Sequence, residues 1–171
     1  GGKGLSLDSK AVMERVQDVR DILVDRVLSH STDQMGERFL DQNVQFVDAH
    51  HFTAGDQTFR ADQMVIAVGS RPIMPAAWQA LGDQVLTTDS FFEQQDLPES
   101  MAVIGLGVIG LELGQALSQL GVDVTGVDAL ETIAGLKDPL INQSAVQLIG
   151  KHFPLILGQQ AQLEKSGNII R

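Results

Sequence analysis

The sequence predicts an α/β protein: a Rossmann-like dinucleotide-binding βαβ unit with a parallel sheet, preceded by a long helix and an antiparallel β-meander. Three observations predict this fold. The apolar run Ala102–Ile104 leads directly into a G-x-G-x-x-G turn formed by Gly105, Gly107 and Gly110. A helical stretch and a second apolar run follow. That second run ends on Asp128, eighteen positions beyond Gly110, which is close to where a ribose-binding acid belongs.

A long amphipathic helix is expected at the start of the chain. Asp8 or Ser9 can cap it, and it should stop near Ser29–Thr32. A shorter helical piece is expected around Gln34–Leu40. Apolar residues recur at spacings of three and four on one face of the long helix, at Val12, Val16, Val19, Leu23 and Val27.

The pattern then changes to the period of two that is typical of strands. Val44–Asp48 favours one strand, a turn is expected at Ala54–Asp56, and Thr58–Arg60 favours the next strand. Met64–Val68 is a continuous apolar run that ends at Gly69. Such a run predicts a strand that is buried on both faces.

The segment 71–98 contains three prolines and the only tryptophan, and it predicts an extended linker with short turns. A domain boundary is expected near Leu97, between residues 1–96 and 97–171. Beyond the glycine turn, Asp138 and Pro139 predict the first residues of another helix. Pro154–Leu157 predicts a short parallel strand, and Ala161–Ile170 a hairpin.

Each glycine of the turn has a physical reason to be glycine. Gly105 permits a tight turn, Gly107 lets backbone amides approach a pyrophosphate, and Gly110 lets the helix pack closely against the strand. The diphosphate is expected at the positive end of the helix that opens near Val108 and Ile109, where N–H groups point outward.

Asp128 is expected to accept hydrogen bonds from the hydroxyls of the adenosine ribose. Between Asp128 and Leu136 there is no Arg or Lys to neutralise a 2′-phosphate, and the carboxylate itself would repel one. The sequence therefore favours NAD over NADP as the cofactor.

Composition excludes several classes of function. A formal charge of −10 argues against a nucleic-acid partner. No run approaches the roughly eighteen apolar residues of a membrane span, and no signal peptide is visible, so a cytoplasmic location is expected. The sequence holds no cysteine, and the adjacent His50 and His51 would project to opposite faces of a strand, so no metal site is expected. The chain begins with Gly1 instead of methionine, which predicts a piece of a longer protein.

Four segments in this order carry a resemblance to a known family: Val65–Pro72, Thr87–Asp89, Leu97–Pro98 and Gly105–Gly114. Together they resemble the flavin-dependent pyridine nucleotide–disulfide oxidoreductases and, within that family, the dihydrolipoamide dehydrogenases most of all. The resemblance implies that residues 1–96 are part of an FAD-binding domain and residues 97–171 part of an NAD-binding domain.

The resemblance also implies roles for individual residues. Glu112 matches an acid that lies near the nicotinamide and the flavin. Ala49 and His50 fall where the family's backbone touches the adenine of FAD. The second FAD motif, usually Ala-Thr-Gly, is matched by Ala67, Val68 and Gly69. The NAD pyrophosphate loop and its ribose acid are matched by Gly105, Gly107, Gly110 and Asp128.

The family's first FAD motif, its redox-active cysteine pair and its dimerisation domain are missing from the sequence. The resemblance therefore implies a fragment without catalytic residues of its own. Its homodimeric parent would transfer hydride between NAD(H) and FAD, coupled to a redox disulfide and a small disulfide or lipoyl-type substrate. Two alternatives stay open: a stand-alone NAD-binding module or redox sensor, and a scaffold protein that keeps a degenerate Rossmann fold. These residues do not decide which disulfide is the substrate.

Overall fold

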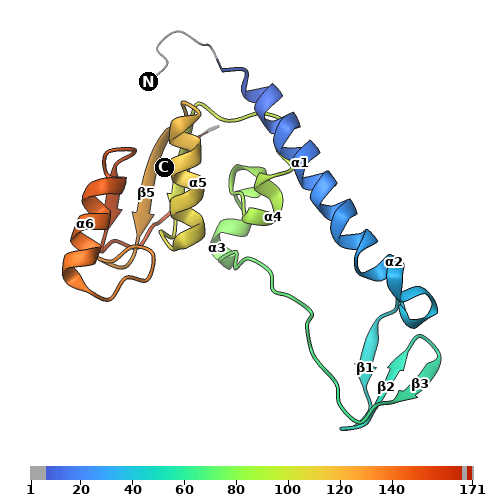
Figure 1. Ribbon diagram of the computed structural model, residues 1–171. Helices are drawn as coiled ribbons and strands as arrows, with labels where there is room; N and C mark the ends of the chain where they lie inside the picture. Colours follow the sequence, from blue (N-terminus) through green and yellow to red (C-terminus); the bar gives the residue numbers. More distant parts are fainter. Residues whose placement is uncertain (1–6, 167–168, 171) are drawn as a thin grey trace. The chain divides into compact units, whose positions relative to one another are not determined.

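The structure is a computed structural model that describes residues 7–166 and 169–170 (Figure 1). Its contacts divide the chain into two compact units. The first contains the described residues up to Val16 and from Met74 onward, and the second is Gln17–Ile73. The domain boundary that the sequence predicts near Leu97 would separate an FAD-binding part from an NAD-binding part. Contacts within the chain do not test which ligand a part binds, so this boundary stays a prediction.

The long N-terminal helix is confirmed as α1 (Ser9–Ser29). Asp8 caps it, since its carboxylate accepts a hydrogen bond from the Ala11 N–H at 3.2 Å. Helix α2 (Thr32–Met35) and the 3₁₀ helix η1 (Gly36–Arg38) follow. They occupy the place of the expected shorter helical piece and begin two residues earlier than the sequence suggests.

The expected antiparallel meander is also present in the second unit. It consists of β1 (Val44–Phe46), β2 (His51–Ala54) and β3 (Gln57–Arg60), paired in the order β1-β2-β3. The turn between β2 and β3 uses Gly55 at φ +59°, in the left-handed region that glycine enters without strain. Across this pair, the rings of Phe52 and Phe59 stack with their centroids 5.3 Å apart.

The apolar run Met64–Val68 is not a strand, and this prediction was wrong. Residues 61–75 form no helix or strand, and the side chains of Val65 and Val68 are 92% and 89% exposed. Hydrophobicity identifies a segment that suits a buried strand, but the strand also needs neighbours for its N–H and C=O groups. In the described chain, β3 pairs only with β2, so no strand partner is offered to this run.

In the first unit, the linker forms no strand, but it is less extended than the sequence predicts, because it carries three short helical segments. It contains α3 (Ala76–Gln79), the 3₁₀ helix η2 (Gly82–Gln84) and α4 (Thr88–Phe91). The hydroxyl of Ser9 donates to the carboxylate of Asp96, which attaches the start of α1 to the end of the linker. This bond, together with one from the N–H of Leu97, holds the pKa of Asp96 below its ordinary value.

The predicted Rossmann-like sheet is confirmed by three parallel strands in the order β4 (Ser100–Ile104), β5 (Asp123–Asp128) and β6 (Leu155–Leu157) (Figure 1). Helix α6 (Pro139–Ile149) is capped by Asp138, as predicted, because its carboxylate accepts hydrogen bonds from two backbone N–H groups at 2.9 and 3.1 Å. A short antiparallel pair, β7 (Lys165–Ser166) and β8 (Ile169–Ile170), follows the sheet; Gly167 of the predicted hairpin turn lies outside the described residues. Helix α5 (Val108–Gln119) connects β4 to β5, and helix α6 connects β5 to β6.

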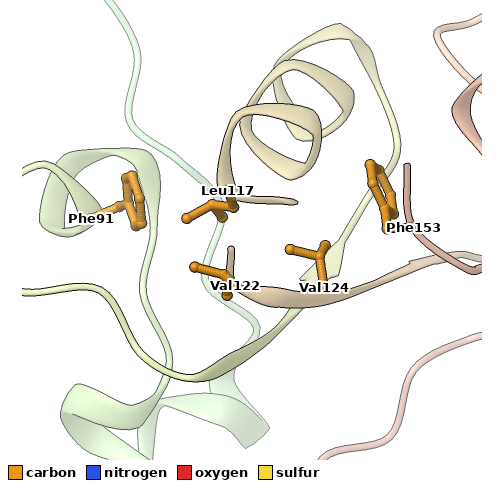
Figure 2. Close-up of a cluster of buried hydrophobic side chains, with 5 residues drawn as sticks. All are labelled: Phe91, Leu117, Val122, Val124 and Phe153. Atoms are coloured by element: carbon orange, nitrogen blue, oxygen red, sulfur yellow. The ribbon is translucent and has the colours of Figure 1, made fainter. Parts of the chain in front are cut away.

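The core of the first unit brings the linker helix and the βαβ unit together. Figure 2 shows five buried side chains that come from α4, α5, β5 and the segments beside them: Phe91, Leu117, Val122, Val124 and Phe153. Phe153 is only 3% exposed. A second buried cluster packs Leu106 of the glycine turn against Leu111 and Ile133.

No helix in the described part of the chain is long and apolar enough to cross a membrane.

Candidate dinucleotide-binding site

The glycine turn joins the end of β4 to the start of α5. Gly105 has φ +93°, and its N–H still donates to the carbonyl of Val127 at 2.9 Å, so the chain turns immediately after its last backbone–backbone bond to β5. Gly110 has no space for a side chain, because an added Cβ would lie 2.0 Å from the carbonyl oxygen of Gly105. At these two positions the fold itself requires glycine.

Gly107 differs from both of its neighbours in the motif. It is the N-cap of α5, with φ −66° and ψ −178°, a conformation that any residue can adopt. An added Cβ would meet no heavy atom within 4 Å. Nothing in the described chain therefore requires glycine at this position.

The first turn of α5 presents backbone N–H groups without helical partners. The first bond within the helix runs from the N–H of Leu111 to the carbonyl of Gly107 at 3.0 Å, so the N–H groups of Val108, Ile109 and Gly110 precede it. In the described residues no side chain caps this end. The exposed N–H groups and the helix dipole make it attractive to an anion.

Asp128 lies at the end of β5 and is bonded to the glycine turn. Its Oδ2 accepts a hydrogen bond from the N–H of Leu106 at 2.6 Å, and its Oδ1 accepts one from the N–H of Leu130 at 2.8 Å. A carboxylate offers about four acceptor positions, so each oxygen keeps room for another donor. Asp128 thus holds the turn in place and can still accept a hydrogen bond from a sugar hydroxyl.

Leu106 stabilises the glycine turn, although the sequence motif leaves this position undefined. Its side chain is fully buried against Leu111 and Ile133. Its N–H donates to Asp128, and its carbonyl accepts from the N–H of Ala134 at 2.8 Å, which ties the turn to the loop after β5. An apolar residue between two glycines was the only sequence signal of this role.

A cleft of about 610 Å³ opens at the carboxyl ends of β4 and β5. One wall comes from the strand ends and includes Ile104, Val127 and Asp128. The other walls come from Trp78 of the linker and from residues 159–164. Ligands of open α/β sheets bind in crevices at this edge of the sheet.

Glu112, the acid implied by the family resemblance, lies in the second turn of α5 and is exposed. It does not belong to the residues that line the cleft. Its role near a nicotinamide and a flavin stays a prediction.

The residues expected to contact FAD all lie in the second unit. Ala67, Val68 and Gly69 belong to the segment without regular structure, in which Gly69 has φ +69°. Ala49 and His50 lie in the turn between β1 and β2.

The adjacent His50 and His51 both bond to the carboxylate of Asp48. The N–H of His50 donates to Asp48 Oδ1 at 2.7 Å, and the ring Nδ1 of His51 lies 2.9 Å from Asp48 Oδ2. The bond from the His50 N–H is the main cause that lowers the pKa of Asp48, and the His51 ring adds to it. The described residues contain no group of three His, Cys, Asp or Glu side chains that could hold a metal ion.

Comparisons with known proteins match this arrangement to one family. The family described as pyridine nucleotide-disulphide oxidoreductase matches residues 6–162. A soluble pyridine nucleotide transhydrogenase of Mycobacterium bovis is 34% identical over 100 residues, which cover 55% of this chain and 21% of that protein. A dihydrolipoyl dehydrogenase of Bacillus subtilis is 36% identical over 89 residues, which cover 52% of this chain and 19% of that protein. The chain therefore spans about a fifth of the length of these relatives.

Solved structures agree on the fold. The HOCl-induced flavoprotein disulfide reductase RclA from Escherichia coli is 17% identical with a TM-score of 0.80, covering 95% of this chain and 38% of its own. The water-forming NADH oxidase from Lactobacillus brevis, bound to NADH, is 26% identical with a TM-score of 0.61, covering 76% of this chain and 33% of its own.

The parallel sheet, the glycine turn and the extent of the family match lead to the same assignment. The family match covers almost all of the chain, from the first helix to the cleft. The resemblance seen in the sequence is thereby confirmed, and the chain belongs to the pyridine nucleotide-disulphide oxidoreductase family.

Proposed function

We propose that the first unit binds NAD(H) at the glycine turn. In this arrangement the diphosphate lies against Gly107 and the open N–H groups of Val108 and Ile109, and Asp128 accepts hydrogen bonds from the adenosine ribose. The observation that carries the proposal is the open space at Gly107. Because no contact within the described chain requires glycine there, a ligand packed against the backbone explains the residue.

The charges of the site support NAD(H) over NADP(H). Asp128 is the proposed partner of the ribose, and the next residue along the chain is Ala129, which offers no positive charge to a 2′-phosphate. The Lactobacillus brevis oxidase is bound to NADH. Its engineered form bound to NADPH carries, among five substitutions, an aspartate changed to alanine and the following alanine changed to arginine.

The proposal for the whole protein goes further. The chain is part of a dihydrolipoyl-dehydrogenase-like oxidoreductase that uses NAD and FAD, acts on a small disulfide or lipoyl-type substrate, and forms a cytoplasmic homodimer. Support comes from the family and from the names of its relatives. When bound, the nicotinamide accepts or gives hydride, and the residues of this chain bind and orient the nucleotide.

FAD fits the described residues less well than NAD. The segment with Ala67, Val68 and Gly69 is exposed and has no strand beside it, so its backbone forms no cradle comparable to the glycine turn. FAD binding therefore belongs to the proposal for the longer parent and not to this chain alone.

Replacing Gly107 by valine tests the NAD(H) site. Its free energy of unfolding should lie within about 1 kcal/mol of the wild-type value, because the new side chain meets open space and only the N-cap preference for glycine over valine is lost. It should bind NADH at least about tenfold more weakly, a loss of roughly 1.4 kcal/mol, because the side chain occupies the space of the diphosphate. Calorimetric titration with NADH and a thermal melt of the same samples measure both effects.

Gln119→Val, at the exposed last residue of α5, is the matched control for Gly107→Val. It places the same valine side chain at the far end of the same helix and should leave NADH affinity unchanged. Equal NADH affinity of Gly107→Val and wild type would refute the proposed site. An absence of NADH binding by the wild-type chain would refute it as well.

Cofactor preference provides a second test. Wild type should bind NADH about tenfold more tightly than NADPH, because the Asp128 carboxylate repels a 2′-phosphate. The double variant Asp128→Ala, Ala129→Arg should reverse this order, since an arginine pairs with phosphate. Calorimetry with both nucleotides measures the ratio, and Asp128→Ala, Ala129→Gln separates the effect of charge from that of size. If the wild-type chain binds NADH and NADPH with equal affinity, this result contradicts the assignment of Asp128 as the partner of the adenosine ribose.

A further inference from the structure

The linker contributes a tryptophan to the cleft beside Asp128. Trp78 is the only tryptophan of the chain; it lies on α3, is half-buried, and lines the cleft together with Pro75 and Ala77. Nothing in the glycine motif requires an aromatic residue in a segment that precedes it by more than twenty positions. Trp78 is therefore a feature of this cleft that the nucleotide-binding motif does not account for.

The lining of the cleft selects an uncharged ligand group. It includes no Lys or Arg, while Asp128 and Glu164 supply negative charge. A diphosphate is therefore disfavoured in the cleft and favoured at the amide-lined start of α5. Ile104, Val127 and Trp78 instead offer apolar surface of the kind that a flat ring covers well.

The wall of the cleft that residues 159–164 form is held against the end of β5. The N–H of Gly158 donates to the carbonyl of Leu130 at 3.0 Å, and the N–H of Gln159 donates to the carbonyl of Asp128 at 3.1 Å. This wall continues into Gln160 and Gln162, whose amides can both donate and accept hydrogen bonds. Amide groups of this kind match the polar edge of a nucleobase.

We propose that Trp78 binds the adenine of NAD(H) by stacking its indole on the base. This inference rests on the NAD(H) site proposed above: Asp128 holds the adenosine ribose, and the base attached to that ribose then enters the cleft that Asp128 and Trp78 both line. Stacking of a base on an aromatic side chain contributes measurably to nucleotide affinity. The linker thus acts as part of the nucleotide site.

The test uses the whole chain and titrates it with NADH, AMP and nicotinamide mononucleotide. Trp78 emission reports stacking directly, because no second tryptophan contributes to the signal. AMP should quench this emission, and nicotinamide mononucleotide should not. Calorimetry should show that Trp78→Ala binds both NADH and AMP about tenfold more weakly than wild type. Trp78→Phe should bind them within about threefold of wild type, because a smaller ring still stacks.

Gln79→Ala is the matched control, since Gln79 is the exposed neighbour of Trp78 and does not line the cleft. If AMP binds the wild-type chain without changing the Trp78 emission, the inference is overturned. This outcome does not depend on whether any variant folds. Equal NADH affinity of wild type and Trp78→Ala overturns the inference but leaves the NAD(H) site intact. Wild type that binds no NADH overturns both proposals.

Discussion

Replacing Gly110 by alanine is expected to destabilise the first unit by about 3 kcal/mol, at the upper end of the cost of overpacking. The added Cβ would lie 2.0 Å from the carbonyl oxygen of Gly105. Both atoms are fixed by backbone, so no side chain can rotate away to relieve the clash. Helix α5 would have to move off β4, which would separate Leu111 from Leu106 and Ile133 in the buried cluster below the turn.

Chemical denaturation of Gly110→Ala, followed by circular dichroism, measures this loss. Gly107→Ala is the matched control, because it adds the same methyl group to the same turn where space is open. The free energy of unfolding of this control should stay within about 1 kcal/mol of the wild-type value, the cost of alanine in place of glycine at an N-cap. Equal unfolding midpoints for Gly110→Ala and Gly107→Ala would show that α5 does not approach β4 as closely as described.

Replacing Phe153 by alanine should cost about 4 kcal/mol, in the range measured for buried aromatic residues. Phe153 is 3% exposed and packs with Leu117 and Val124 (Figure 2). Its ring fills the space left by Gly114 of α5 and Gly126 of β5, where an added Cβ would lie 2.8 and 2.9 Å from the ring. Removal of the ring would leave a cavity that these backbones cannot close.

Urea unfolding of Phe153→Ala, Phe153→Leu and His152→Ala measures this effect. Phe153→Leu keeps part of the packing and should lose less than Phe153→Ala. His152 is the exposed neighbour, and its ring contacts only Gln115 among the hydrogen bonds described for it, so His152→Ala should cost about 0.5 kcal/mol or less. A loss in Phe153→Ala no greater than in His152→Ala would contradict the described core.

The elements that the sequence predicts well are those specified by neighbouring residues. The cap at Asp8, the Asp138–Pro139 start of α6 and the left-handed turn at Gly55 depend on hydrogen bonds and dihedral angles within a few positions. The glycine turn is of the same kind. Its strand, turn and helix follow one another directly, so the spacing of Gly105 and Gly110 is sufficient to predict the bend.

The parts that the sequence did not predict depend on contacts between distant residues. The bond between the Leu106 N–H and Asp128 joins positions 22 apart, and no local pattern indicates it. The role of Phe153 depends on two glycines in other elements, and the place of Trp78 in the cleft depends on how the linker folds back on the sheet.

The sequence by itself determined the βαβ unit, its helix caps and the acid at the end of its second strand, because short-range geometry and hydrophobic periodicity specify them. Only the tertiary structure decided that Met64–Val68 stays outside any sheet, because a strand forms only where other strands satisfy its backbone. It also supplied the distances behind the packing role that the sequence predicts for Gly110, and it showed open space beside Gly107. The physical reason is the same in each case: steric space and hydrogen-bond partners are properties of the folded chain and not of its order of residues.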